Sequence, residues 1–122
     1  MPLRFVLDEH LRGPLWGAIQ QHNARGSDVI DAVRVGDLPD LPLGTTDPDL
    51  LLWAEREGRV VVSRDWNTFP YHLAAHLLSG HHSPGVVILR PGHTLPQLVF
   101  TLALAAHATD PGEFRDQVRF LP

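Results

Sequence analysis

Residues 47–65 read DPDLLLWAEREGRVVVSRD, and this stretch decides the fold. Its opening Asp-Pro-Asp favours the first turn of a helix, with Asp47 as the N-cap, proline in the first helical position and an acid at the positive end of the helix dipole. The helix is expected to end near Gly58. The β-branched run at 59–63 then predicts a buried strand followed by Asp65. One helix leading into one buried strand is the repeating unit of an α/β sheet.

The same alternation extends outward in both directions. Expected strands lie at 4–7, 28–35, 59–63, 85–89 and 117–121, and expected helices at 11–25, 47–58, 69–78 and 95–107. The central strands are continuously apolar, which is typical of strands covered on both faces of a parallel sheet. The helix at 95–107 is apolar almost all round and should pack deeply. We predict an α/β fold, a three-layer α/β/α sandwich with a central, mainly parallel sheet, as a single domain over residues 1–122.

Composition is that of an ordinary globular chain. Apolar residues make up 43% of its 122 residues and charged residues 20%, which is enough apolar material for one core. No run approaches the ~20 apolar residues of a membrane span. Without a signal-like N-terminus or any cysteine, we expect a cytoplasmic protein without disulfides. The net charge of −4 means that a nucleic-acid partner would need a local basic patch or metal ions.

Acidic residues follow two of the predicted strands. Asp8 and Glu9 come directly after the first, and Asp65 follows the third. In open parallel sheets, ligands bind beyond the carboxyl ends of the strands, where the strand order reverses. Asp47 and Asp49 start the helix that leads to the third strand, and they reach the same edge only if the preceding loop allows it. Such acids repel one another unless a cation joins them, and oxygen ligands select Mg²⁺ or Mn²⁺.

Each of these acids also has an ordinary structural role. Taken alone, Asp47 is first a helix cap, although a cap that accepts one N–H keeps lone pairs free for a metal. Asp8 is harder to assign to structure alone, because a charge after a buried strand must be solvated, paired or metal-bound. A metal at these strand ends could activate water and stabilise charge on a phosphate, so the pattern suits a phosphodiesterase.

Three stretches together resemble a known family: FVLDEHL at 5–11, TDPDLLLWAEREGRVVVSRD at 46–65 and SPGVVIL at 83–89. Their order and spacing are similar to those of short prokaryotic PIN-like domain proteins, relatives of the VapC-type toxin nucleases. The ending QVRFLP at 117–122 also resembles a branch of that group. The resemblance covers nearly the whole chain and rests on the combination of motifs rather than on any one of them.

The resemblance implies roles for individual residues. Asp8 matches the aspartate that ends the first PIN strand, and Asp47 matches the aspartate seven residues before a helix alanine, here Ala54. Asp65 matches the aspartate of a Thr/Ser-x-Asp motif, in which Ser63 would orient a carboxylate. In that family these acids bind Mg²⁺ or Mn²⁺ and support RNA cleavage. The resemblance thus implies a metal-dependent endoribonuclease, the toxin of a toxin–antitoxin pair, with RNA as substrate, a small antitoxin as partner and a homodimer as the assembly.

The chain departs from the family pattern in its fourth acid. Many relatives carry an acid two residues after the last aspartate, where this chain has Asn67, and the other usual acid, a helical glutamate, has no clear match. Glu9 or Asp49 could substitute, but three carboxylates would hold a metal more weakly. The alternative is therefore a catalytically degenerate PIN-fold binding module that acts through a protein partner. A phosphate-receiver domain is disfavoured because the chain has no lysine.

Residues next to the acids could contact a substrate. His10 could touch phosphate or orient a carboxylate, and Arg64 could bind phosphate or pair with an acid. Trp66 could stack on a base, although a partly buried packing role is the preferred interpretation.

Four histidines follow along the chain. His72 and His76 lie four apart on one face of the predicted helix, and His81 and His82 come soon after. The spacing would permit zinc, but no glutamate stands in the metalloprotease position between the first two. The preferred interpretation is a polar face near the site or an interface.

Overall fold

The computed structural model describes residues 2–121. Its strands are β1 (Arg4–Leu7), β2 (Asp31–Arg34), β3 (Val60–Ser63), β4 (Val86–Leu89) and β5 (Val118–Leu121). Its helices are α1 (Pro14–Ala24), α2 (Asp47–Glu57), α3 (Phe69–Leu78) and α4 (Leu95–Ala108), with 3-10 turns at Glu9–Leu11 and Pro111–Glu113. Strands and helices alternate along the chain as the sequence predicts.

The five strands form one sheet in the order β2-β1-β3-β4-β5, and every neighbouring pair is parallel. From β1 the chain moves to β2 on one side and then returns to β3 on the other side. The strand order therefore reverses between β1 and β3. In doubly wound sheets of this order, that switch point is where ligands bind, beyond the carboxyl ends of the two strands.

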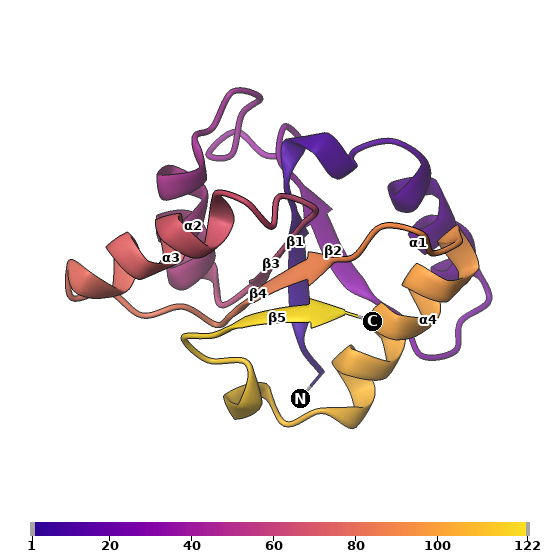
Figure 1. Ribbon diagram of the computed structural model, residues 1–122. Helices are drawn as coiled ribbons and strands as arrows, with labels where there is room; N and C mark the ends of the chain where they lie inside the picture. The colour runs from indigo at the N-terminus through magenta and orange to yellow at the C-terminus, as the bar shows by residue number, and fades with distance from the viewer. Residues whose placement is uncertain (1, 122) are drawn as a thin grey trace.

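Helices cover both faces of the sheet (Figure 1), with α1 and α4 on one face and α2 and α3 on the other. Successive side chains of a strand point to opposite faces. Phe5 and Leu7 of β1 accordingly pack with α1 and α4, whereas Val6 packs with α2 and α3. Both β3 and β4 are buried along their whole length. The predicted three-layer α/β/α sandwich with a parallel central sheet is confirmed.

The start of α2 differs from the prediction by one residue. Thr46, not Asp47, is the N-cap, and its hydroxyl accepts a hydrogen bond from the Asp49 backbone N–H at 3.3 Å. Thr46 has the extended backbone of an N-cap, which leaves Asp47 and Pro48 in the first helical turn. The Asp47 carboxylate therefore does not serve as the helix cap. The helix ends at Glu57, next to Gly58 as the sequence predicts, and Gly58 caps it in the left-handed conformation.

Helix α4 is less deeply packed than its apolar sequence predicts. Phe100 is 68% exposed and Leu104 is 54% exposed, because only the opposite side of the helix faces the sheet and α1. Strand β2 is also shorter than predicted, and Asn23 of α1 makes two side-chain hydrogen bonds to Ile30 just before it. No helix within residues 2–121 has the length and apolarity needed to cross a membrane.

Candidate functional site

Asp8 and Ser63 join the carboxyl ends of β1 and β3. Asp8 follows β1, and its backbone N–H donates to the Val62 carbonyl of β3 at 3.0 Å. The Ser63 hydroxyl donates to Asp8 Oδ2 at 2.5 Å, and His10 N–H donates to Asp8 Oδ1 at 3.0 Å. Asp8 is only 5% exposed. Burial raises its pKa, the bonds from Ser63 and His10 oppose the rise, and the charge of Asp47 adds to it.

Asp65 lies two residues beyond the same serine. Its backbone N–H donates to Ser63 Oγ at 3.0 Å, so one hydroxyl contacts both Asp8 and the Asp65 backbone. The Asp65 carboxylate accepts hydrogen bonds from Asn67 N–H, Thr68 N–H and the Thr68 hydroxyl. The Thr68 hydroxyl is the main reason that the pKa of Asp65 lies below its usual value. Asp65 therefore orders the turn into α3 while lying at the switch point.

Asp47 reaches the same edge because the loop at 36–46 folds back on itself, with Gly36 N–H donating to the Leu41 carbonyl. Asp47 lines a cavity of 230 Å³ together with Asp8 and six further residues: Glu9, His10, Val35, Gly44, Thr45 and Leu50. Its Oδ2 lies 3.6 Å from His72 Nε2 of α3. The positive charge of a protonated His72 would also contribute to the low pKa of Asp65. His72 thus stands near both Asp47 and Asp65.

The two acids that could substitute for a fourth ligand, Glu9 and Asp49, lie in different places. Glu9 accepts a hydrogen bond from Gly44 N–H at 2.6 Å, which ties the 3-10 turn to the loop before α2. Asp49 lines a different cavity, beside Asp40 and Trp53, and is not brought to Asp8. Of the two substitute acids, therefore, only Glu9 shares the cavity of Asp8 and Asp47.

Two exposed aromatic residues follow Asp65 in the chain. Trp66 is 64% exposed and Tyr71, in the first turn of α3, is 77% exposed. The preference for a packing role of Trp66 is wrong, since most of its surface faces solvent. Arg64 and Asn67 are exposed as well. The carboxyl edge near Asp65 thus combines acids with exposed aromatic residues and the exposed Arg64, groups that suit a phosphate chain with unpaired bases.

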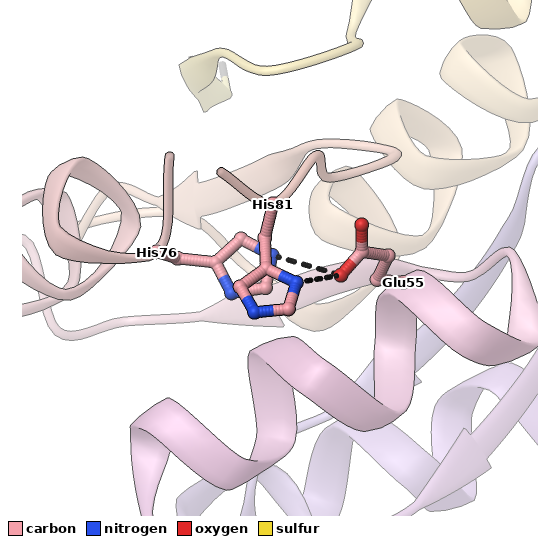
Figure 2. A group of neighbouring side chains, drawn as sticks. All are labelled: Glu55, His76 and His81. Atoms are coloured by element: carbon pink, nitrogen blue, oxygen red, sulfur yellow. Dashed lines mark hydrogen bonds and ion pairs between the residues drawn. The ribbon is translucent and has the colours of Figure 1, made fainter. Parts of the chain in front are cut away.

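A second cluster could hold a metal ion, and it lies elsewhere. Glu55, His76 and His81 each offer a ligand atom within 4.8 Å of the others, the one such group of acids and histidines found in residues 2–121. Figure 2 shows both imidazole rings directed at the same carboxylate oxygen, Glu55 Oε1. His81 Nδ1 lies 2.9 Å from it and His76 Nε2 lies 3.5 Å from it. The carboxylates of Asp8, Asp47 and Asp65 do not form so tight a group.

Sequence reasoning named the two histidines of this cluster but missed its acid. No glutamate stands between His72 and His76 in the sequence, and Glu55 comes from the last turns of the preceding helix. Helices α2 and α3 cover the same face and lead into β3 and β4, so their last turns both lie at the amino edge of the sheet. The alternation of helices and strands was the signal that could have paired Glu55 with His76.

Comparisons with models of known protein families, with characterised proteins and with solved structures found no match to this chain.

Proposed function

We propose that the protein is a metal-dependent ribonuclease of PIN-like type that acts at the β1/β3 switch point. The observation that carries the proposal is the junction of two strand ends through one hydroxyl: Ser63 Oγ contacts Asp8 and the Asp65 backbone. Asp47 lines the same cavity as Asp8. Three acids that are distant in sequence therefore lie at one edge of the sheet, where ligands of doubly wound folds bind.

The donor atoms at this edge are of the type that a hard divalent cation prefers. All are carboxylate oxygens, which suit Mg²⁺ and Mn²⁺, and each oxygen that accepts one hydrogen bond retains a lone pair. The raised pKa of Asp8 reflects a buried charge beside Asp47, which a cation would relieve. Asp8, Asp47 and Asp65 would hold the ion, with Glu9 at the rim. When bound, the ion would supply an activated water and charge stabilisation on the phosphodiester.

The chain's own residues would position the acids and the RNA. The Ser63 hydroxyl and His10 N–H fix both oxygens of Asp8, so its carboxylate cannot rotate freely. Arg64 would contact a phosphate, and Trp66 would stack on an unpaired base, as aromatic residues do in proteins that bind single-stranded RNA. Exposed rings cost little to desolvate and select unpaired bases over a duplex. These groups suit a single-stranded nucleic acid, and the resemblance makes RNA the proposed substrate.

Cleavage of a fluorescent oligoribonucleotide in Mn²⁺ tests the proposal. Asp8→Asn and Asp65→Asn should each abolish metal-dependent cleavage, since each removes a charged ligand. Asp49→Asn is the matched control, because Asp49 starts the same helix as Asp47 but lines another cavity. Cleavage that persists at the wild-type rate in both variants would remove the mechanism.

A degenerate binding module is the second candidate, and two observations favour it. Asn67 stands where relatives have an acid, and hydrogen bonds to both Asp65 oxygens already serve the turn into α3. Titration with Mn²⁺ separates the candidates. A nuclease should bind the ion with an affinity that falls in Asp8→Asn, whereas an inert module should show no carboxylate-dependent binding.

The resemblance suggests the partners. As a toxin, the chain would work in the cytoplasm and pair with a small antitoxin that covers the acidic edge and blocks RNA cleavage. It would also form a homodimer. A small antitoxin-like reading frame beside the gene is the expected observation. Co-expression should then yield a stable complex that no longer cleaves RNA, and the free chain should elute as a dimer in size-exclusion chromatography.

A further inference from the structure

We propose that Glu55, His76 and His81 form a binding site for a transition-metal ion of the zinc class, which joins the ends of α2 and α3 to the loop before β4. The site lies at the amino edge of the sheet, opposite Asp8 and Asp65. It is independent of the nuclease proposal and shares none of its residues.

The donor set selects the class of ion. Two imidazole nitrogens and one carboxylate oxygen suit Zn²⁺, whereas Mg²⁺ and Ca²⁺ prefer sites made of oxygen alone. A further position would remain for water, as in zinc sites with three protein ligands. Water can reach the cluster, because the side chains of Glu55 and His81 are 31% and 43% exposed.

The spacing of the donor atoms fits one small ion. Ligands about 2.0–2.1 Å from a tetrahedral zinc stand roughly 3.3 Å from one another. Glu55 Oε1 lies 2.9 Å from His81 Nδ1 and 3.5 Å from His76 Nε2, values on either side of that separation. The third pair, one nitrogen from each imidazole, lies within 4.8 Å, so a reorientation of the two stacked rings would bring all three donors to one ion.

The cluster is held in place by contacts outside it. The side chain of His76 is only 3% exposed, and its ring stacks on that of His81 with centroids 4.8 Å apart. The other oxygen of Glu55 accepts a hydrogen bond from His82 N–H at 2.8 Å, which fixes the carboxylate. A partly preformed site loses less conformational entropy when an ion binds.

His76 has one competing contact. Its Nε2 lies 2.8 Å from the His82 carbonyl oxygen, to which an Nε2–H would donate in the metal-free protein. Zinc would take the place of that proton, with the Nε2 lone pair turned to the ion and the ring proton on Nδ1. His82 is an exposed residue of the loop before β4, and its carbonyl would then form a hydrogen bond with water.

Titration of the metal-free full chain with Zn²⁺ alone tests the site by calorimetry and thermal unfolding. Zinc should raise the unfolding temperature of the wild type and of Asp8→Asn, and in Asp8→Asn, which lacks the proposed switch-point site, an equal concentration of Mg²⁺ should leave it unchanged. Glu55→Gln and His81→Asn should each weaken zinc binding about tenfold or more, since the loss of supporting groups alone costs that much. The exposed His93 supplies the matched control His93→Gln, and Asp8→Asn should bind zinc like the wild type.

Ring ¹⁵N shifts of the wild type give a readout that needs no variant. Zinc should shift His76 and His81 and leave His93 unchanged. The proposal is overturned if these two rings do not respond, or if Glu55→Gln and His81→Asn, when folded, bind zinc as tightly as the wild type. Loss of zinc binding in Glu55→Gln with undiminished RNA cleavage would separate this site from the nuclease edge.

Discussion

Asp8 is expected to be needed for metal-dependent cleavage and to lower the stability of the metal-free protein. Its charge is buried and lies near Asp47, so its pKa is raised. In the metal-free protein an ionised Asp8 lowers stability above that raised pKa, and the cost disappears as the pH falls below the pKa of an unfolded-chain aspartate. Asp8→Asn should thus raise the unfolding temperature at neutral pH by about 2–4 °C while abolishing Mn²⁺-dependent cleavage.

The gain in Asp8→Asn should shrink in acid, where the wild-type carboxyl is itself neutral in both states. Thermal unfolding in EDTA, followed by circular dichroism from neutral to acidic pH, checks the sign. A variant that is less stable than the wild type at neutral pH would mean that the hydrogen bonds to Asp8 outweigh the cost of its burial.

Gly85 is a position where only glycine fits. Its φ is +132°, and a Cβ there would lie 2.5 Å from the Phe114 carbonyl oxygen. Gly85→Ala should therefore lower the free energy of unfolding by about 3 kcal/mol or more. Gly80 has φ +89° with open space around it, so Gly80→Ala should cost only about 1–2 kcal/mol for the backbone strain. Urea denaturation measures both, and equal losses would show that the close approach to Phe114 does not matter.

At the scale of elements, the first turn of α2 assigns capping to Thr46 and the proposed metal binding to the neighbouring Asp47. Thr46→Ala removes the hydroxyl that accepts Asp49 N–H and should cost about 1 kcal/mol of stability. Asp47→Asn removes a charge from the first turn but also relieves repulsion of Asp8, so its stability should change by less than about 0.5 kcal/mol. Mn²⁺ affinity should respond in the reverse order, falling in Asp47→Asn only. A large stability loss in Asp47→Asn would show that Asp47, and not Thr46, caps the helix.

Most elements were predictable because burial patterns are local. A run of apolar residues between breakers specifies β3 or β4, and Gly58 specifies the end of α2. The exposure of Phe100 was not predictable, because the apolar pattern of α4 does not say which of its sides the sheet will cover. The cap at Thr46 was missed because Asp47 before a proline carries the same local signal.

At the scale of the whole molecule, the candidate sites were likewise only partly predictable from the sequence. Asp8 and Asp65 could be assigned to one edge because both follow parallel strands, a consequence of topology alone. The position of Asp47 depended on how the loop at 36–46 closes, which no periodic pattern encodes. The contact between Glu55 and His81 required the packing of two helices and a loop, and it became visible only in three dimensions.

The net charge predicts that RNA binding by the proposed nuclease depends on the metal. The chain has 14 acidic residues against 10 basic ones, so the phosphates of RNA are repelled unless a cation screens the edge at Asp8 and Asp47. Binding of a cleavage-resistant phosphorothioate oligoribonucleotide should therefore weaken about tenfold or more when Mn²⁺ is replaced by EDTA.

Stacking on a base is worth about 1–3 kcal/mol, so Trp66→Ala should also weaken RNA binding about tenfold, without changing Mn²⁺ affinity. Leu78→Ala is the control, since Leu78 is exposed and apolar at the other end of α3. Fluorescence anisotropy measures the RNA affinity of the wild type, Trp66→Ala and Leu78→Ala. A wild-type RNA affinity that is equal with and without Mn²⁺ would point to a basic surface away from this edge.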